Sequence, residues 1–142
     1  MTRSPRRPQY CRMQDYHQLH VWERAHAFAV EIRRVAGQFP PSFSELRSQI
    51  IRAGESIPSN LVEGCGAATR REFARFVDIS IKSTAEVQYR LELARDHSLL
   101  VPETWEELTS EVVQIRKMLH GLRKKLLAAG AASRHRRPGA ER

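Results

Sequence analysis

Hydrophobic residues recur at intervals of three and four along most of the chain. The clearest run consists of Trp105, Leu108, Val112, Ile115, Leu119, Leu122 and Leu126. Because a helix turns once every 3.6 residues, this spacing places all seven side chains on one side of a helix. Pro102 suits the first helical position, which needs no N–H donor, and Gly130 is a typical stop. The pattern predicts a helix over residues 102–128.

The same spacing predicts three further helices, over residues 21–36, 42–63 and 70–97. Two of them begin with a Ser/Thr-x-x-Glu sequence, at Ser42 and at Thr69. In this capping box the hydroxyl and the carboxylate each accept a hydrogen bond from a backbone N–H near the helix start. Both boxes therefore predict where a helix begins.

The second and third predicted helices each carry an unusual position in the middle. Pro58 lies inside the second helix, where it removes the backbone hydrogen bond to Gly54, so we expect a kink there. Ser80 and Thr84 interrupt the hydrophobic side of the third helix. Small polar residues at such positions indicate a close contact between two helices.

Short connections between four helices favour an antiparallel arrangement, because each helix then packs on its neighbour in the chain. The sequence predicts an all-α fold, an antiparallel up-down-up-down four-helix bundle. Apolar residues outside the four hydrophobic sides would face outward: Ile51, Val62, Ile79, Tyr89 and Leu93. This surplus indicates contacts between copies of the chain. Scattered exposed apolar residues, which are common on protein surfaces, are the alternative.

The net charge of +8 is concentrated at the two ends of the 142-residue chain. Residues 1–14 contain four arginines and no acid, and residues 130–142 contain four arginines and one glutamate, which leaves residues 15–129 at +1. Both ends are poor in large apolar residues, so we predict disordered basic tails at 1–14 and 130–142 around one bundle domain at 15–129. Met13 is an alternative start to Met1.

The chain shows no signal for export, a membrane, a metal or a cofactor. It contains no apolar run near the roughly 20 residues that span a bilayer and no secretory leader, so we expect a cytoplasmic protein. Its six histidines form no H-E-x-x-H or Cys/His cluster. Cys65 lies between two glycines, where a buried thiol is favoured over a reactive one.

A polar group around Pro58 predicts a structural clasp between the second and third helices. Its members are Arg52, Pro58, Asn60, Glu63 and Glu86, with Arg75 on a neighbouring turn. A pair of carboxylates could instead perform acid–base catalysis. The chain contains no phosphate-binding loop and no nucleophile elbow, so we predict no catalytic residue and no enzymatic activity.

Basic residues of the third and fourth helices are the folded candidates for contacts with phosphate. They are Arg70, Arg71, Arg75, Arg116, Lys117, Arg123, Lys124 and Lys125. Such residues bind RNA or DNA through the backbone charge, and their effect multiplies when copies of a basic chain assemble. The alternative is that these bases are solvated and balance nearby acids.

Seven segments of the sequence resemble one protein family. They are residues 16–22, 39–40, 48–53, 56–64, 72–76, 85–86 and 117–122, of which Ser-Ile-Pro-Ser-Asn followed by Glu-Gly at 56–64 is the most specific. The chain is similar here to the four-helix-bundle proteins encoded by intervening sequences of bacterial 23S ribosomal RNA genes, also called S23 ribosomal proteins. The resemblance covers about residues 16–127 and neither tail.

The resemblance implies a homopentamer around a central channel, in agreement with the surplus of apolar surface. Distant relatives of this architecture are accessory proteins of diversity-generating retroelements, which implies RNA or DNA and a reverse transcriptase as partners. We therefore expect a non-enzymatic, homo-oligomeric accessory protein that binds nucleic acid. A structural or protein-recruiting scaffold with no nucleic-acid role is the alternative.

Overall fold

Four α-helices make up most of residues 15–135, the part of the chain that the computed structural model describes. They are α1 (His20–Ala36), α2 (Ser44–Cys65), α3 (Arg70–Asp96) and α4 (Pro102–His135). Short 3-10 turns precede α1 at Tyr16–Gln18 and α2 at Pro41–Phe43. The predicted disorder at 1–14 and 136–142 lies outside the described residues.

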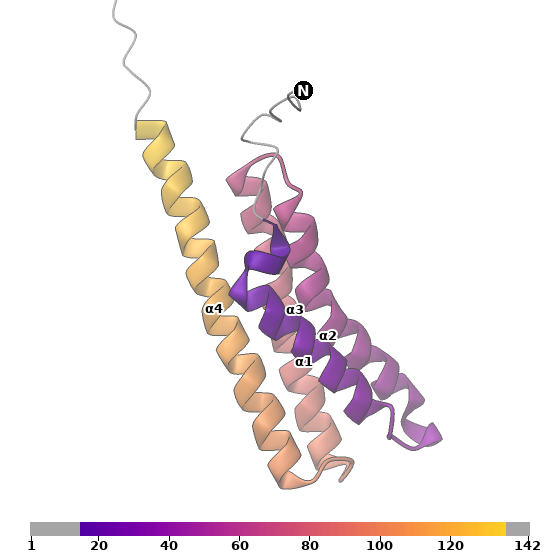
Figure 1. Cartoon of the computed structure of the whole chain (residues 1–142). Helices are drawn as coiled ribbons and strands as arrows, with labels where there is room; N and C mark the ends of the chain where they lie inside the picture. Colours follow the sequence, from indigo (N-terminus) through magenta and orange to yellow (C-terminus); the bar gives the residue numbers. More distant parts are fainter. Residues whose placement is uncertain (1–14, 136–142) are drawn as a thin grey trace, which may run out of the picture.

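The helices run alternately up and down, as the short connections predicted (Figure 1). α2 packs between α1 and α3, and α3 packs between α2 and α4. α4 makes less contact with α1 and continues past the level at which α1 begins (Figure 1). The predicted all-α, antiparallel bundle is confirmed.

The predicted hydrophobic sides meet in one core. Its largest fully buried side chains come from all four helices and include Ile32, Ile50, Ile57, Leu61, Phe73, Val77, Leu91, Ile115 and Leu119. Burial of each such side chain contributes roughly 1.5–3 kcal/mol. At the edges of the same core, Trp105, Leu122 and Leu126 of α4 are only partly buried. Each helix thus depends on its neighbours for burial.

The predicted capping box at Ser42 is wrong. α2 begins at Ser44, its N-cap is Phe43, and no side chain caps it. Pro41 starts a 3-10 turn in which Phe43 N donates to the carbonyl of Pro40 at 2.9 Å, so Ser42 lies inside that turn. Proline fixes its own φ near the value of a 3-10 or α turn, so the chain begins to coil before Ser42 can act as a cap. α2 ends at Cys65 rather than at residue 63.

The capping box at Thr69 forms, with a shifted return bond. Thr69 Oγ1 accepts a hydrogen bond from Glu72 N at 3.0 Å, and Glu72 Oε2 accepts one from Ala68 N rather than from Thr69 N, at 3.2 Å. The carboxylate reaches one residue further back than the motif predicts. α3 therefore begins at Arg70, as predicted.

The prediction that Gly130 ends the fourth helix is wrong, because α4 continues to His135. A single glycine inside a helix costs about 1 kcal/mol relative to alanine. Here two alanines precede it and two follow it, at 128–129 and 131–132, and alanine has the highest helix propensity. The six residues 130–135, assigned to the tail from their composition, are helical.

Candidate functional site

Serine hydroxyls make the contact between α2 and α3 beside Pro58. Ser80 Oγ donates to the carbonyl of Ile57 at 2.9 Å, and Ser80 is fully buried. The hydroxyls of Ser83 and Ser56 lie 2.8 Å apart, across the same two helices. Small polar side chains allow the helices to approach closely here and bond to each other. The close contact indicated by Ser80 in the sequence is present.

Of the residues predicted to form a clasp, Asn60 joins this contact indirectly. Its Nδ2 donates to the carbonyl oxygen and to Oγ of Ser56, at 2.8 and 3.0 Å, and Ser56 in turn meets Ser83 of α3. Pro58 is buried on α2, but its side chain lies toward α1, near Trp22 and His26. Of the two, only Asn60 is thus placed at the junction of α2 and α3.

The charged members of the predicted clasp lie elsewhere. Arg52, Glu63 and Arg75 are exposed, and within residues 15–128 no hydrogen bond or ion pair of their side chains joins them to another residue. Glu86 pairs along its own helix with Arg90, at 3.2 Å. Sequence spacing placed these residues on the correct helices but did not show that uncharged hydroxyls would make the contact.

Two of the eight predicted phosphate contacts bind α3 instead. Arg116 donates to Thr84 Oγ1 at 2.9 Å and to Gln88 Oε1 at 2.5 Å. Arg123 Nε lies 2.5 Å from Asp78 Oδ1. Both guanidinium groups therefore contribute to the packing of α4 on α3, so their charges are less accessible to an external phosphate.

The other six predicted phosphate contacts are exposed: Arg70, Arg71, Arg75, Lys117, Lys124 and Lys125. None of them forms an ion pair within the described residues. The Arg123–Asp78 pair marks a level at which α4 meets α3, and because the helices are antiparallel, Arg75 and Arg71 lie beyond this level on the same side as Lys124 and Lys125. Five exposed bases thus gather at the end of the bundle that carries the α2–α3 turn, while Lys117 lies nearer the middle.

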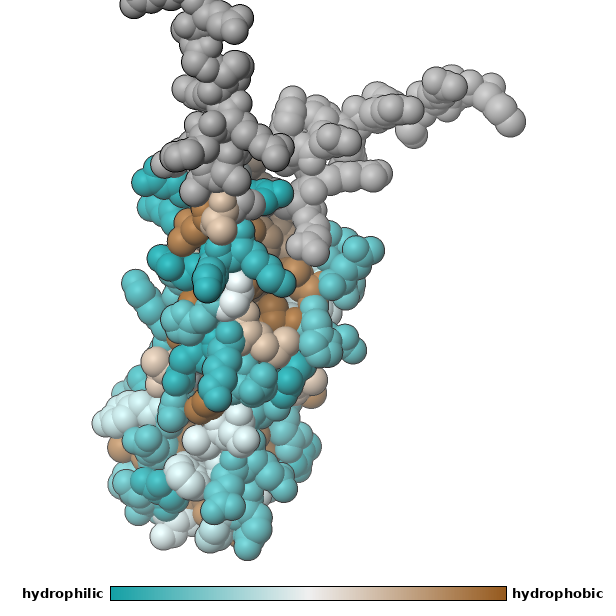
Figure 2. Space-filling model, turned by 90° about the vertical axis from the view of Figure 1, so that its left-hand side faces the viewer, coloured by the Kyte–Doolittle hydropathy of each residue, from teal (hydrophilic) through white to brown (hydrophobic). Residues whose placement is uncertain are grey.

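The first part of α4 carries the opposite charge. Its acids are Glu103, Glu106, Glu107 and Glu111. The second part, from Arg116 to Lys125, contains five bases and no acid. Hydrophilic side chains cover much of the α4 side of the molecule, with apolar side chains showing between them (Figure 2). α4 is therefore acidic near the α3–α4 turn and basic near the α2–α3 turn.

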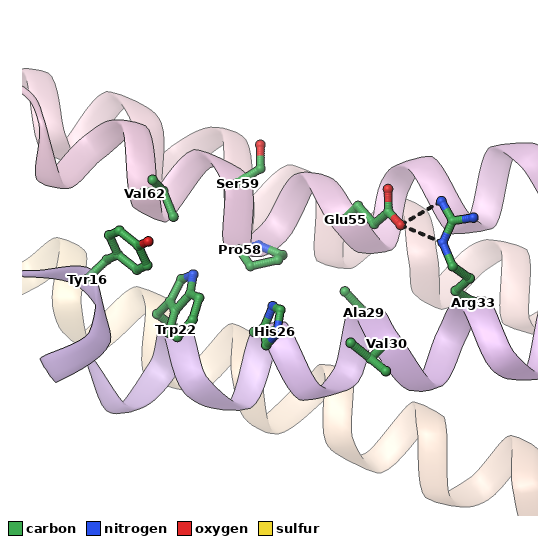
Figure 3. A pocket seen from close by; sticks show the side chains of 10 residues that line it. All are labelled: Tyr16, Trp22, His26, Ala29, Val30, Arg33, Glu55, Pro58, Ser59 and Val62. Carbon is green, nitrogen blue, oxygen red and sulfur yellow. Dashed lines mark hydrogen bonds and ion pairs between the residues drawn. The ribbon is translucent and has the colours of Figure 1, made fainter.

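A groove of about 380 Å³ lies between α1 and α2 (Figure 3). Tyr16, Trp22 and His26 form one wall, in which the rings of Trp22 and His26 stack with centroids 5.0 Å apart. Pro58 and Val62 lie opposite, on α2. This groove is not predicted from the sequence, in which its one signal is the spacing of aromatic residues before and along the first helix.

Cys65 is buried at the end of α2, as predicted. Burial, with a smaller effect from the charge of Asp15, raises the pKa of the thiol to about 11. Within the described residues, no group of three or more His, Cys, Asp or Glu side chains is arranged to hold a metal ion. None of the helices described is long and apolar enough to cross a membrane.

The sequence model of the 23S rRNA-intervening sequence proteins matches residues 17–121. The chain belongs to this family. A solved relative is a protein of unknown function from the S23 ribosomal protein family of Bacteroides thetaiotaomicron, with 27% identity and a TM-score of 0.69. The match covers 73% of this chain and 95% of that protein. A comparison with curated proteins finds no match.

The match of the 23S rRNA-intervening sequence protein family confirms the resemblance found in the sequence. It spans α1, α2 and α3 and the first part of α4, up to Gly121. Lys124 and Lys125 lie beyond the matched residues, whereas Arg70, Arg71 and Arg75 lie within them. The basic end of the bundle therefore combines residues from inside and outside the region that the family model covers.

Proposed function

We propose that this member of the 23S rRNA-intervening sequence protein family is a non-enzymatic homo-oligomer that binds nucleic acid through the phosphate backbone. The observation that carries the proposal is the gathering of exposed bases at one end of the bundle. Arg70, Arg71, Arg75 and Lys124 are its central members, and none of them is neutralised by an ion pair within the described residues. Exposed bases of this kind bind RNA or DNA with little dependence on base sequence.

Assembly would strengthen this binding. The family resemblance implies a pentamer, and exposed apolar residues such as Ile79 and Tyr89, 43% and 58% exposed, supply surface for contacts between copies. In a ring, the same end of every copy lies on the same side, so the bases of all copies would act on one polyanion. A reverse transcriptase as partner stays a prediction from the resemblance.

The test is the binding of fluorescent single-stranded RNA of mixed sequence, measured by anisotropy over a range of salt concentrations. We expect affinity to fall steeply as salt rises, because the protein releases counterions from the RNA when it binds, and added salt opposes this release. The slope of log K against log salt is negative. In the double variant Arg71→Ala/Arg75→Ala it should become shallower, by about 2 for each subunit that contacts the RNA. The matched control, Arg52→Ala/Lys82→Ala, removes two exposed bases elsewhere and should leave the slope unchanged.

Two results would contradict the proposal. One is the absence of RNA and DNA binding near physiological salt, and the other is equal loss of binding in both double variants. A protein partner that stays bound after nuclease treatment, together with no salt-dependent binding of RNA, would instead favour the scaffold function.

A further inference from the structure

Gly121 lies on α4 at a position where the packing of a single copy would also allow a larger residue. It is exposed, and a Cβ atom placed on it would meet no atom within 4 Å. At Gly64, by contrast, a Cβ would lie 2.7 Å from the ring of Phe73. Glycine inside a helix costs roughly 0.5–1 kcal/mol relative to alanine. Packing within one copy does not explain Gly121, whereas close approach of a second copy would.

Gly121 is the centre of a basic row on the outer side of α4. The row is Lys117, Gly121 and Lys125, at intervals of four residues. α2 carries an acidic row of the same spacing, Glu55, Ser59 and Glu63. All six residues are exposed. Residues four apart form the ridges by which helices interlock, and the charged ends of each row are about 12 Å apart along the axis. The two rows match in length, differ in sign, and each has a small residue at its centre.

The acidic row borders the groove between α1 and α2. Glu55 and Ser59 line this groove, and its apolar lining includes Trp22, Pro58 and Val62 (Figure 3). Arg33 contacts Glu55 through Oε1 alone, at 2.8 Å from both Nε and Nη2, which leaves Oε2 for another partner. An apolar groove that is lined by Glu55, with Glu63 exposed two turns further along the same helix, suits a helix whose outer side is basic.

We propose that α4 of one copy lies in the α1–α2 groove of the next copy, with Lys117 and Lys125 facing the acidic row and Gly121 next to Ser59. This assignment rests on the proposed function, in that it locates the self-assembly supposed there. The contact is heterologous, because it joins two different surfaces. Heterologous contacts form rings when the rotation between copies closes, and they do not form two-fold dimers. α4 and α2 lie on different sides of α3 (Figure 1), so one copy can use both surfaces at once.

The two proposals divide the exposed bases between them. Lys117 and Lys125 belong to the contact between copies, and Arg70, Arg71, Arg75 and Lys124 stay available to phosphate. Arg70, Arg71 and Arg75 are on α3, whereas the row is on α4. Variants of one group can therefore be tested without changing the other.

Two blocking variants test the contact by light scattering on a sizing column. Gly121→Trp fills the outer side of α4, and Ser59→Trp fills the groove. Both positions are exposed, so neither tryptophan must enter the core. We expect the wild-type chain to assemble, each variant alone to have the mass of one chain, and an equal mixture to have the mass of two chains. The mixture forms a single contact because one variant keeps its groove and the other keeps its α4 surface.

Controls separate this inference from the proposed function. Gln38→Trp, at an exposed position between α1 and α2 that belongs to neither row and lies apart from Ile79 and Tyr89, should keep the wild-type mass, and circular dichroism should show equal helix content in all variants. If the blocking variants keep the wild-type mass, or if their mixture stays at one chain, the assigned contact is wrong while self-assembly stands. If the wild-type chain has the mass of one copy, the contact and the proposed oligomer both fail. RNA binding, measured separately, then decides the rest of the proposed function.

A charge exchange gives a second test that does not depend on bulk. Glu55→Lys/Glu63→Lys and Lys117→Glu/Lys125→Glu should each prevent assembly, since like charges then face each other across the contact. The chain with all four changes should recover the wild-type mass. Failure of the fourfold variant to assemble, with unchanged helix content, would show that the two rows do not face each other.

Discussion

Arg24 of α1 and Glu111 of α4 form a two-point ion pair. Arg24 Nε lies 2.9 Å from Oε1 of Glu111, and Nη2 lies 2.7 Å from Oε2. The two side chains are 32% and 34% exposed, so water screens the pair only in part. α1 packs chiefly against α2, and this pair ties it to α4 as well.

Glu111→Gln should lower the free energy of unfolding by about 1 kcal/mol, because a two-point bond between charged groups is lost. Urea unfolding followed by circular dichroism measures the change, and the loss should shrink as salt rises. Glu31→Gln is the matched control, since Glu31 pairs with Arg34 at the surface of a single helix, and it should cost at most about 0.5 kcal/mol. Equal losses in the two variants would contradict the special role of the Arg24–Glu111 pair.

Gly64→Ala should destabilise the chain by about 1–3 kcal/mol through overpacking. The new Cβ would lie 2.7 Å from Cδ1 of Phe73 and 3.2 Å from Cβ of Phe76, and the ring of Phe73 is fully buried and has no room to turn away. Gly66→Ala, where a Cβ would meet only the Glu63 carbonyl at 3.4 Å, is the control and should change stability by less than about 1 kcal/mol. Thermal unfolding compares the two, and an unaffected Gly64→Ala variant would show that α2 and α3 can separate there.

Ser80→Ala should lower the free energy of unfolding by about 1 kcal/mol, because the buried hydrogen bond to the Ile57 carbonyl is lost. Ser110→Ala, on the exposed side of α4, should instead raise stability by a few tenths of a kcal/mol through helix propensity, roughly as host peptides show. Chemical unfolding of both variants measures the difference. Identical stabilities would mean that the hydroxyl contact between α2 and α3 contributes nothing.

Cys65 should react slowly with iodoacetamide in the folded protein. With a pKa raised to about 11, the thiol is roughly 0.1% thiolate at pH 8, and burial restricts access as well. The reaction rate should rise tenfold per pH unit up to that pKa and should rise sharply in denaturant, where the ordinary thiol pKa returns. The measurement uses mass spectrometry in a Cys11→Ser background. Fast alkylation of the native chain at pH 8 would contradict the burial of Cys65.

Hydrophobic spacing was sufficient to predict the helices and their order, because burial of one side of each helix dominates the energy of the bundle. Helix ends were predicted less well, since they depend on weaker local effects. At Ser42 the turn formed by Pro41 took precedence over a capping hydroxyl. At Gly130 the flanking alanines outweighed a single glycine.

The candidate site was predicted in part, and the errors have a common cause. Residue type and spacing identify arginines but not their partners in other helices. Arg116 and Arg123 have the same spacing as a surface row, yet each finds an acceptor on α3, at Thr84 and Asp78. The groove at Trp22 depends on how α1 and α2 lie together, which no local pattern encodes. The register between helices is the missing information.

The charge separation along α4 gives the folded part of the molecule a permanent electric moment along its long axis. Acids gather near Glu103 and Glu107, and bases gather near Lys124. The field of an approaching polyanion would orient each molecule with its basic end forward. A larger fraction of collisions would then lead to binding. This effect acts on the rate of encounter more than on the lifetime of the complex, so added salt should slow association far more than it speeds release.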